Sequence, residues 1–570
     1  MTSRRAQRPQ GPPDPKPFTT SDEPEPSLPQ APSPEIGHGC RWYDVPFVLL
    51  RTLLRMRLAR WLPTRVRVKL REASRYMYQV HVTHQRRLDG DPGRHGRIEL
   101  PPSEQVWEPN VWIVEYFTAS TVRHLYAAIR KNGWDGASLD ARSTGTRSLL
   151  SSRSGLGQTW WRITSLVSHS AKLAIFDSHR AKLPDGVDRI ELLGVSIGNG
   201  LTAVVAGFSL SESASDRLNG AIRKEYRPTV IRRKGRLARA ESPKFVLYHE
   251  VQKKRTELHE VLRGWMSTVL PGSFAGAKEP HPLFDLLFFE VAEHWSAEDA
   301  VSQHNDAPRA TGVEVNAPED ISSSHLPGLQ VQLPGGSQWA PGISPNVWTL
   351  WGNRSAVARL TTGTDTMDFG SAGYFVGEAM TDFFVRSGLT SLLSQLRRSA
   401  SAAHDNARHL HGGTSSRDLK RLRNRTLTTS LDLARLRDDL KIYNTQLWRD
   451  REPQFFVNLS PADKALDAAA GRPVSQPIDL NKRERQHQMH LAKELVSFDA
   501  EYRQVLSTVT SLGASLDSRR VQRVATWVSV ASLGTALVAL WLSQDTPPDI
   551  GQVVGDAWVT WNSLPYSPKP

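Results

Sequence analysis

Hydrophobic positions in the last third of the chain recur at heptad spacing. One series runs over Leu419–Leu447 and a second over Leu491–Leu516, each stepping alternately by three and four residues. Such spacing keeps one apolar seam of a helix facing a partner helix. Prolines lie between the two series, so the chain can turn back there. The pattern predicts a helical coiled-coil stalk over residues 401–520, built as an antiparallel pair or as part of a bundle.

An uncharged run of nineteen residues, Val524–Leu542, follows the second series. At a rise of about 1.5 Å per residue, a helix of this length is roughly 28 Å long, close to the thickness of the hydrocarbon core of a bilayer. Its polar residues are Ser and Thr, which can hydrogen-bond back to the helix. We expect a transmembrane helix over residues 521–543, and the alternative is a helix buried in a protein core. The candidate lipid-facing residues are Val524, Trp527, Leu533, Leu537 and Trp541.

The charges on either side of this run predict its orientation. Arginines precede it and aspartates follow it, and positive charge stays on the cytoplasmic side of a membrane. The expected localisation is therefore the cell membrane, with a single pass, a cytoplasmic N-terminal body and a short extracytoplasmic tail at residues 544–570.

The N-terminal part of the chain divides into two segments. Residues 1–40 are rich in proline and predict a disordered leader without a secretory signal. Residues 41–103 form a basic amphipathic segment, which contains fourteen Arg and Lys but only five Asp and Glu between residues 41 and 100. Within it, apolar residues alternate with Arg51, Arg55, Arg57 and Arg60.

This arginine pattern leaves three interpretations open. A helix of this kind lies on an anionic membrane surface, binds the backbone of a nucleic acid, or packs its apolar side on the body of its own protein. The C-terminal anchor would hold the segment near anionic lipid, which favours the membrane and makes nucleic acid the less expected partner.

Residues 104–240 predict a first α+β domain. Val111–Phe117 is rich in aromatic and β-branched residues and indicates a strand. Thr121–Lys131 has helical spacing. Arg189–Ile197 and Leu201–Leu210 indicate two strands joined by Gly198-Asn199-Gly200, a turn in which Asn and Gly accept positive φ. A helix is expected over Ser211–Tyr226.

Residues 241–400 predict a second α+β region. Lys244–Gly272 begins like a strand and continues like a helix, and Val347–Leu360 resembles a hairpin that turns near Gly352. A long loop is expected at residues 296–345 and a helix at Glu378–Arg398. The predicted fold class is therefore an α+β or α/β cytoplasmic body, followed by a helical hairpin stalk and one C-terminal transmembrane helix.

The composition limits the classes of protein and of site. The 570 residues include 72 basic and 58 acidic side chains, a net charge of +14, and 39% hydrophobic residues, enough for a substantial core. The single cysteine, Cys40, excludes an intrachain disulfide and a multi-cysteine metal site. Arg outnumbers Lys by 55 to 17, which together with abundant Ala suggests a GC-rich bacterial genome.

The motifs that carry chemistry are weak. Gly194–Gly200 has the glycines of a phosphate loop but lacks its Lys-Ser/Thr, so a hairpin explains it better. His249-Glu250 and His259-Glu260 are too far apart for HExxH, and we interpret them as solvated helix residues. Glu290, Glu293 and His294 lie within one helical turn and could hold a metal ion or a proton. We assign no catalytic, cofactor-binding or metal-binding residue, and the cofactor is unknown.

The order of segments resembles that of CorA-type magnesium transporters, in which a cytoplasmic α/β domain and a long stalk helix lead into the membrane. The resemblance is one of arrangement and covers roughly the last 150 of the 570 residues. Those transporters have two spans, with a Gly-Met-Asn motif after the first. Here Ser543-Gln544-Asp545 follow the expected span and no second span exists, so we assign no family.

The first functional hypothesis is a non-enzymatic, membrane-anchored sensor, scaffold or membrane effector, whose body binds a ligand or a partner. The lipid bilayer is the expected partner, a homo-oligomer through the stalk is possible, and the protein partner is unknown. The alternatives are a membrane-anchored enzyme, which would show one deep polar pocket, and an oligomeric ion-conducting protein with a CorA-like layout.

Overall fold

The computed structural model describes the chain between residues 43 and 542, with gaps. The described residues are 43–56, 61–88, 100–135, 145–155, 160–169, 178–224, 226, 229–231, 239–241, 243–292, 306–313, 319–323, 325–334, 344–362, 368–409, 416–445, 453–459, 464, 467–471, 473 and 476–542. The expected leader at residues 1–40, Arg57, Arg60 and the expected tail at residues 544–570 lie outside them.

Helices make up most of the described chain. They are α1 (Asp44–Arg55), α2 (Thr64–Leu88), α3 (Val122–Lys131), α4 (Gly145–Arg153), α5 (Glu212–Arg223), α6 (Pro243–Val269), α7 (Ser273–Ala277), α8 (Asp306–Thr311), α9 (Arg354–Thr362), α10 (Phe369–His409), α11 (Ser416–Tyr443) and α14 (Leu480–Leu542).

The strands come from both expected α+β regions and from the range of the expected stalk. They are β1 (Val106–Trp107), β2 (Asn110–Phe117), β3 (Trp160–Ser168), β4 (Ser178–Ala181), β5 (Val187–Ser196), β6 (Thr202–Leu210), β7 (Thr229–Ile231), β8 (Arg239–Glu241), β9 (Leu283–Phe289), β10 (Glu319–Ser323), β11 (Gln330–Gln332), β12 (Val347–Asn353), β13 (Phe455–Leu459) and β14 (Ile478–Asp479).

Twelve of these strands form one mixed sheet. Its order is β14-β13-β10-β11-β12-β9-β2-β6-β5-β3-β4, and β1 pairs with β9 beside β2. The pairs β12–β9 and β3–β4 are parallel and the other described pairs are antiparallel. The regions expected at residues 104–240 and 241–400 therefore share one sheet, with β9 and β2 at its centre.

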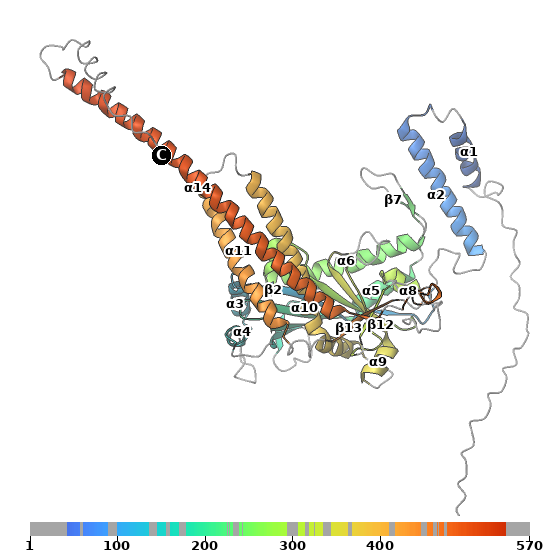
Figure 1. Ribbon diagram of the computed structural model, residues 1–570. Coiled ribbons are helices and arrows are strands. Elements are labelled where there is room, and N and C mark those ends of the chain that lie inside the picture. The colour runs from blue at the N-terminus through green and yellow to red at the C-terminus, as the bar shows by residue number, and fades with distance from the viewer. Residues whose placement is uncertain are drawn as a thin grey trace, which may run out of the picture.

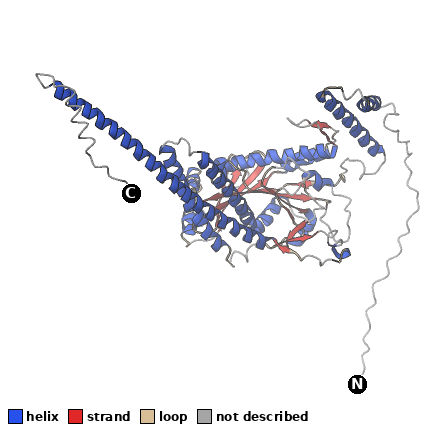
Figure 2. Cartoon of the chain, turned by 45° about the horizontal axis from the view of Figure 1, so that its top comes forward, coloured by secondary structure: helices blue, strands red, loops and turns tan. Residues whose placement is uncertain are grey.

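Helices cover both faces of the sheet (Figure 2). Because successive strand residues point to opposite faces, β2 supplies Trp112, Val114 and Tyr116 to one core cluster, and Val111 and Ile113 to another. The first cluster includes side chains of α10, α11 and α14. The second cluster and a third, smaller one include side chains of α6. Both faces of the central strands are thus buried, which matches their nearly continuous apolar sequences.

Helices α10, α11 and α14 pack together on the first face (Figure 1). The Ser430 hydroxyl of α11 donates a hydrogen bond of 2.6 Å to Asp499 of α14, and buried Arg386 of α10 donates to Asn444 after α11 and to Gln488 of α14. These contacts fix α11 antiparallel to α14. Most described residues of the two heptad seams, such as Leu436, are buried in the core of this chain, whereas Thr429 is exposed and Phe498 is half-buried.

Helix α14 is 63 residues long and leaves the body (Figure 1). A helix of this length measures about 95 Å. Its described side chains from Gln522 to Ala539 are all exposed, including Val524, Trp527, Leu533 and Leu537. The Trp541 side chain lies outside the described part. Among the described residues, no helix is both long and apolar enough to cross a bilayer.

The predictions for individual elements succeed in the first region and fail in part of the second. Strands β2, β5 and β6 and helix α3 lie where the sequence places them, and β5 and β6 pair around residues 197–201. The strand expected at the start of α6 is wrong, because that segment is helical from Pro243. The hairpin expected at Val347–Leu360 is wrong as well, since β12 leads directly into α9. The expected loop at 296–345 contains α8, β10 and β11.

Candidate functional site

A layer of polar side chains crosses the core between the two apolar clusters on the α6 face. On α6, Val251 belongs to one cluster and Leu262 to the other, and Arg255 and His259 lie between them. On β9, Asp285 lies between Leu283 and Leu287 in the same way, because these three residues share one face of the strand. A polar layer inside a core requires specific partners, since an unpaired buried polar group is destabilising.

The centre of this layer is the ion pair between Asp285 and Arg255. Asp285 is fully buried in a strand that is otherwise apolar, and Arg255 donates to its Oδ2. Arg255 also donates to Thr349 Oγ1 at 3.0 Å and to the Thr311 carbonyl oxygen. Burial alone would raise the pKa of Asp285, but Arg255, by its charge and its hydrogen bond, outweighs burial and holds this pKa well below its usual range. Asp285 is therefore ionised.

His259 lies one helical turn after Arg255 and faces the same carboxylate. Its Nε2 is 3.4 Å from Asp285 Oδ2, and this contact is too long and too poorly aligned for a hydrogen bond. The ring is 1% exposed, and neither of its nitrogens has a hydrogen-bond partner among the described residues. Burial lowers the pKa of His259, so the imidazole is neutral. A neutral imidazole is the form that binds metal ions.

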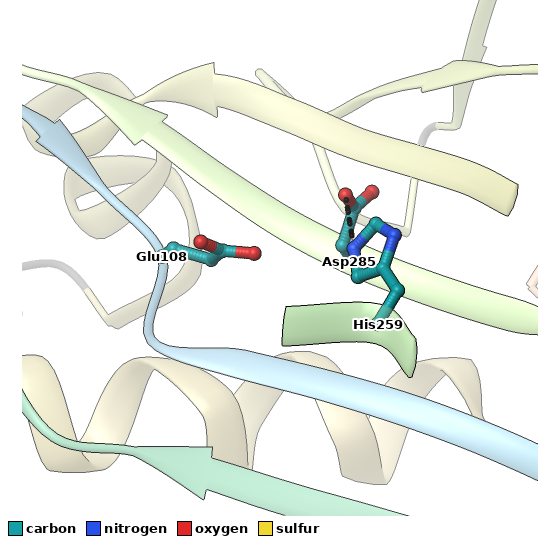
Figure 3. A group of neighbouring side chains, drawn as sticks. All are labelled: Glu108, His259 and Asp285. Carbon is teal, nitrogen blue, oxygen red and sulfur yellow. Dashed lines mark ion pairs between the residues drawn. The ribbon is translucent and has the colours of Figure 1, made fainter. Parts of the chain in front are cut away.

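Glu108 approaches from the link between β1 and β2. Its backbone N–H donates to Ser215 Oγ at 2.9 Å, which holds the link against α5. The Glu108 side chain points toward Asp285 and His259 (Figure 3) and is 2% exposed. Its Oε1 and the Oδ1 of Asp285 are buried without hydrogen-bond partners in the described structure. Burial, together with the nearby charge of Asp285, raises the pKa of Glu108 to about 8, so this carboxyl is protonated at neutral pH.

Glu108, His259 and Asp285 together offer a three-ligand metal site. One possible ligand atom from each residue lies within 4.8 Å of those from the other two. One imidazole and two carboxylates suit zinc and other divalent first-row transition metals, whereas Ca²⁺ and Mg²⁺ prefer oxygen ligands alone. Arg255 is the opposing influence, because a guanidinium beside the site repels a cation and lowers the affinity of the site.

A pocket of about 160 Å³ reaches this layer, lined by Glu108 and Arg255 among others. Two exposed ion pairs flank it: Arg217 with Asp185 at 3.1 Å, and Lys254 with Glu257 at 2.8 Å. Pockets for substrates of drug-like size usually measure about 300–1,000 Å³, so this one suits an ion and a few water molecules. Of the three possible ligands, Glu108 lines this pocket.

The structure places the candidate residues from the sequence in different environments. The interpretation of His259 as a solvated residue is wrong, because its side chain is buried. The sequence gives no sign of this, because Asp285 and Glu108 lie far from His259 along the chain. Glu290 pairs with Arg354 at 2.8 Å, while Glu293 and His294 lie outside the described residues. The sequence missed Glu108 and Asp285, although a lone aspartate inside LFDLLFF was a usable signal.

The sequence-derived membrane-surface candidates Arg51 and Arg55 are exposed on α1, which packs beside α2 (Figure 1). They lie apart from the polar layer, and the hairpin that carries them contacts β7 and β8.

Comparison with known proteins gives little. No family model matches the chain, and no curated protein is similar to it. The chain shows a weak likeness to the solved structure of the CorA magnesium transporter from Methanocaldococcus jannaschii, with 12% sequence identity and a TM-score of 0.14. The likeness covers 50% of this chain and 87% of that chain. It is too weak to carry a conclusion about fold or function.

Proposed function

We propose that the α/β body is a sensor domain that binds a divalent transition-metal ion through Glu108, His259 and Asp285. The observation that carries this proposal is the set of buried ligand atoms without hydrogen-bond partners in the described structure. Buried polar atoms are normally satisfied, and each exception requires an explanation. A bound cation would take one ligand atom from each of the three residues.

The surroundings of the site favour reversible binding over a permanent structural metal. Arg255 already neutralises Asp285, and Glu108 is protonated in the free site, so a cation must displace a proton and tolerate a neighbouring guanidinium. Three protein ligands also leave one coordination position open. Such a site fills and empties as the concentration of the ion changes, which is the property of a sensor.

The small pocket argues against catalysis at Glu108. A catalytic domain requires room for a substrate beside the reacting groups, and the pocket above Glu108 holds about 160 Å³. The site at Glu108 therefore fits an ion-binding role better than a catalytic one.

Isothermal titration of the chelator-treated protein with Zn²⁺, Mn²⁺ and Mg²⁺ tests the proposal. We expect one Zn²⁺ or Mn²⁺ per chain, with much weaker binding of Mg²⁺. His259→Gln and Glu108→Gln should each lower the affinity at least tenfold. His490→Gln is the matched control, because the His490 side chain is 69% exposed on α14. Unchanged binding by His259→Gln would show that the metal ion does not bind at Glu108, His259 and Asp285.

The second candidate function is attachment of this sensor to a membrane by the end of α14. The supporting observation is that every described side chain from Val524 to Ala539 is exposed and uncharged, on a helix that continues to Leu542. Exposing so much apolar surface to water is unfavourable, and lipid would cover it. The double substitution Leu533→Asp/Leu537→Asp should remove the protein from the carbonate-resistant membrane fraction. Retention of this variant in the carbonate-resistant fraction would refute the attachment.

A further inference from the structure

Helix α1 carries apolar residues on two opposite sides. Tyr43 and Phe47 are buried against α2, where Phe47 stacks on Tyr78 and Tyr43 meets the edge of the His81 ring. The opposite stripe faces away from α2 and is exposed: Val45, Val48, Leu49, Leu53 and Met56. Their spacing of three and four residues places them on one side of the helix. Packing on α2 therefore explains only half of the apolar surface of α1.

Positive charge flanks the exposed stripe. Arg55 is exposed on α1 beside it, and Arg51 is exposed closer to α2, with its guanidinium 5.9 Å from the centre of the Phe47 ring. Helix α2 exposes further basic residues: Arg65, Lys69, Arg71 and Arg75. Trp61, just before α2, is 88% exposed. Apolar residues, arginines whose stems can lie along the apolar surface, and an exposed indole are the features of a protein surface that rests in the headgroup region of a bilayer.

The charges also distinguish between two possible partners of the exposed stripe, a second copy of the chain and a lipid surface. A second copy placed symmetrically against this stripe would bring its own arginines beside Arg51 and Arg55, and like charges repel. Anionic headgroups instead supply the opposite charge, and acyl chains cover the apolar side chains. The complementary partner is therefore an anionic lipid surface.

We infer that the outer face of α1, defined by Val45, Val48, Leu49, Leu53 and Met56 with Arg51 and Arg55, docks on an anionic membrane surface. This contact is separate from the metal site and does not depend on it. It is also peripheral, because the stripe belongs to a helix whose other side is packed on α2.

Flotation of the full-length protein with vesicles tests this inference. All variants carry Leu533→Asp/Leu537→Asp, so that the end of α14 does not dominate binding. In this background, the protein should bind vesicles of phosphatidylglycerol and phosphatidylcholine at least tenfold better than vesicles of phosphatidylcholine alone, and added salt should weaken the binding. Adding Leu49→Asp/Leu53→Asp should abolish it.

Leu431→Asp is the matched control, because Leu431 on α11 is 68% exposed and Leu49 is 65% exposed. This control should bind anionic vesicles as the background does, and circular dichroism should show equal helix content in all variants. Equal binding to neutral vesicles, or no loss with Leu49→Asp/Leu53→Asp, would overturn the inference. A change of oligomeric state in that variant, with unchanged vesicle binding, would assign the face to a second copy and would also overturn it.

Discussion

At the scale of single residues, one buried environment leaves one carboxyl group ionised and another protonated. Asp285 keeps its charge because Arg255 donates to it, while Glu108 receives no such donor and retains its proton at neutral pH. The layer without a metal ion is therefore neutral overall, with a charged pair, a neutral imidazole and a neutral acid. This division lets a buried polar layer exist between two apolar clusters.

The proton on Glu108 predicts how stability changes with pH in the metal-free protein. Its pKa is about 8 in the folded state and about 4.5 for an ordinary glutamate, so the folded protein holds a proton that the unfolded chain loses. The free energy of unfolding should therefore fall as the pH rises from about 4.5 to 8. At about 1.4 kcal/mol per pKa unit, the fall amounts to a few kcal/mol.

Chemical denaturation in the presence of a chelator, at several pH values between 5 and 8, measures this dependence. Glu108→Gln keeps the shape of the side chain without the titration, so its stability should fall less over this range. An identical pH slope in the two proteins would show that Glu108 does not carry the proton.

The Asp285–Arg255 pair predicts a large mutational effect. Arg255→Leu leaves a buried carboxylate without its cation, so the free energy of unfolding should fall by about 3–5 kcal/mol. Arg217→Leu is the control, because Arg217 pairs with the exposed Asp185 and its loss should cost less than about 1 kcal/mol. Urea titration of both variants measures the difference. Similar losses of stability would show that burial does not determine how much the ion pair contributes to the free energy of unfolding.

At the scale of elements, a carboxylate of α11 fixes the turn between β5 and β6. The backbone N–H of Asn199 donates to Asp439 Oδ1 at 3.0 Å, and that of Gly200 donates to Asp439 Oδ2 at 3.0 Å. Asp432, two turns earlier, accepts hydrogen bonds from Thr118 and Ser120 after β2. These contacts hold α11 on the end of the sheet.

The close approach of Asp439 makes Gly198 intolerant of a side chain. A Cβ there would lie 2.3 Å from Asp439 Oδ1, so Gly198→Ala must displace the carboxylate and weaken its hydrogen bonds. We expect a loss of about 1–3 kcal/mol and faster amide exchange in α11. Gly220→Ala on α5 meets no atom within 4 Å and should stabilise its helix by up to about 1 kcal/mol. Equal stability of the two variants would contradict this packing.

The sequence predicts elements where local chemistry determines them, and it fails where the longer context does. Val111–Phe117, rich in aromatic and β-branched residues, forms β2 as its local pattern predicts. The β5–β6 turn lies at Gly198-Asn199-Gly200 as predicted, but none of these residues has the expected positive φ, and Asp439 holds the turn by accepting from the N–H groups of Asn199 and Gly200. Residues 245–251 resemble a strand locally, yet Leu247, Val251 and Arg255 continue a helical repeat that is buried along α6. After β12, Asn353 accepts a hydrogen bond from the Ala356 N–H at 3.0 Å and begins α9, where the sequence indicated a turn.

The metal site was beyond sequence reasoning for a different reason. His259 is one polar residue on a helix, and nothing near it in sequence shows that it meets Glu108 and Asp285. Those three residues converge only because β1 and β2 lie beside β9 in the sheet and α6 covers that face. Contacts between residues so far apart in sequence follow from the topology, which local patterns do not specify.

At the scale of the whole molecule, α14 links the body to the exposed apolar run. Its first part is built into the core through Leu491 and Leu495, and its described side chains from Gln522 to Ala539 are all exposed. The folded body should therefore not depend on the end of the helix. Most described seam residues pack within one chain, and a homo-oligomer through the helical pair remains a prediction.

A chain ending at Ser518 separates the two proposed roles. Because the removed run contributes no described side chain to the core, the shortened protein should keep its Zn²⁺ affinity within about twofold and its urea midpoint almost unchanged. Carbonate should extract the shortened protein from membranes, whereas the full chain should resist carbonate extraction. Loss of metal binding on truncation would mean that the end of α14 acts on the body. A full chain that is itself soluble would assign Val524–Leu542 to contact with protein.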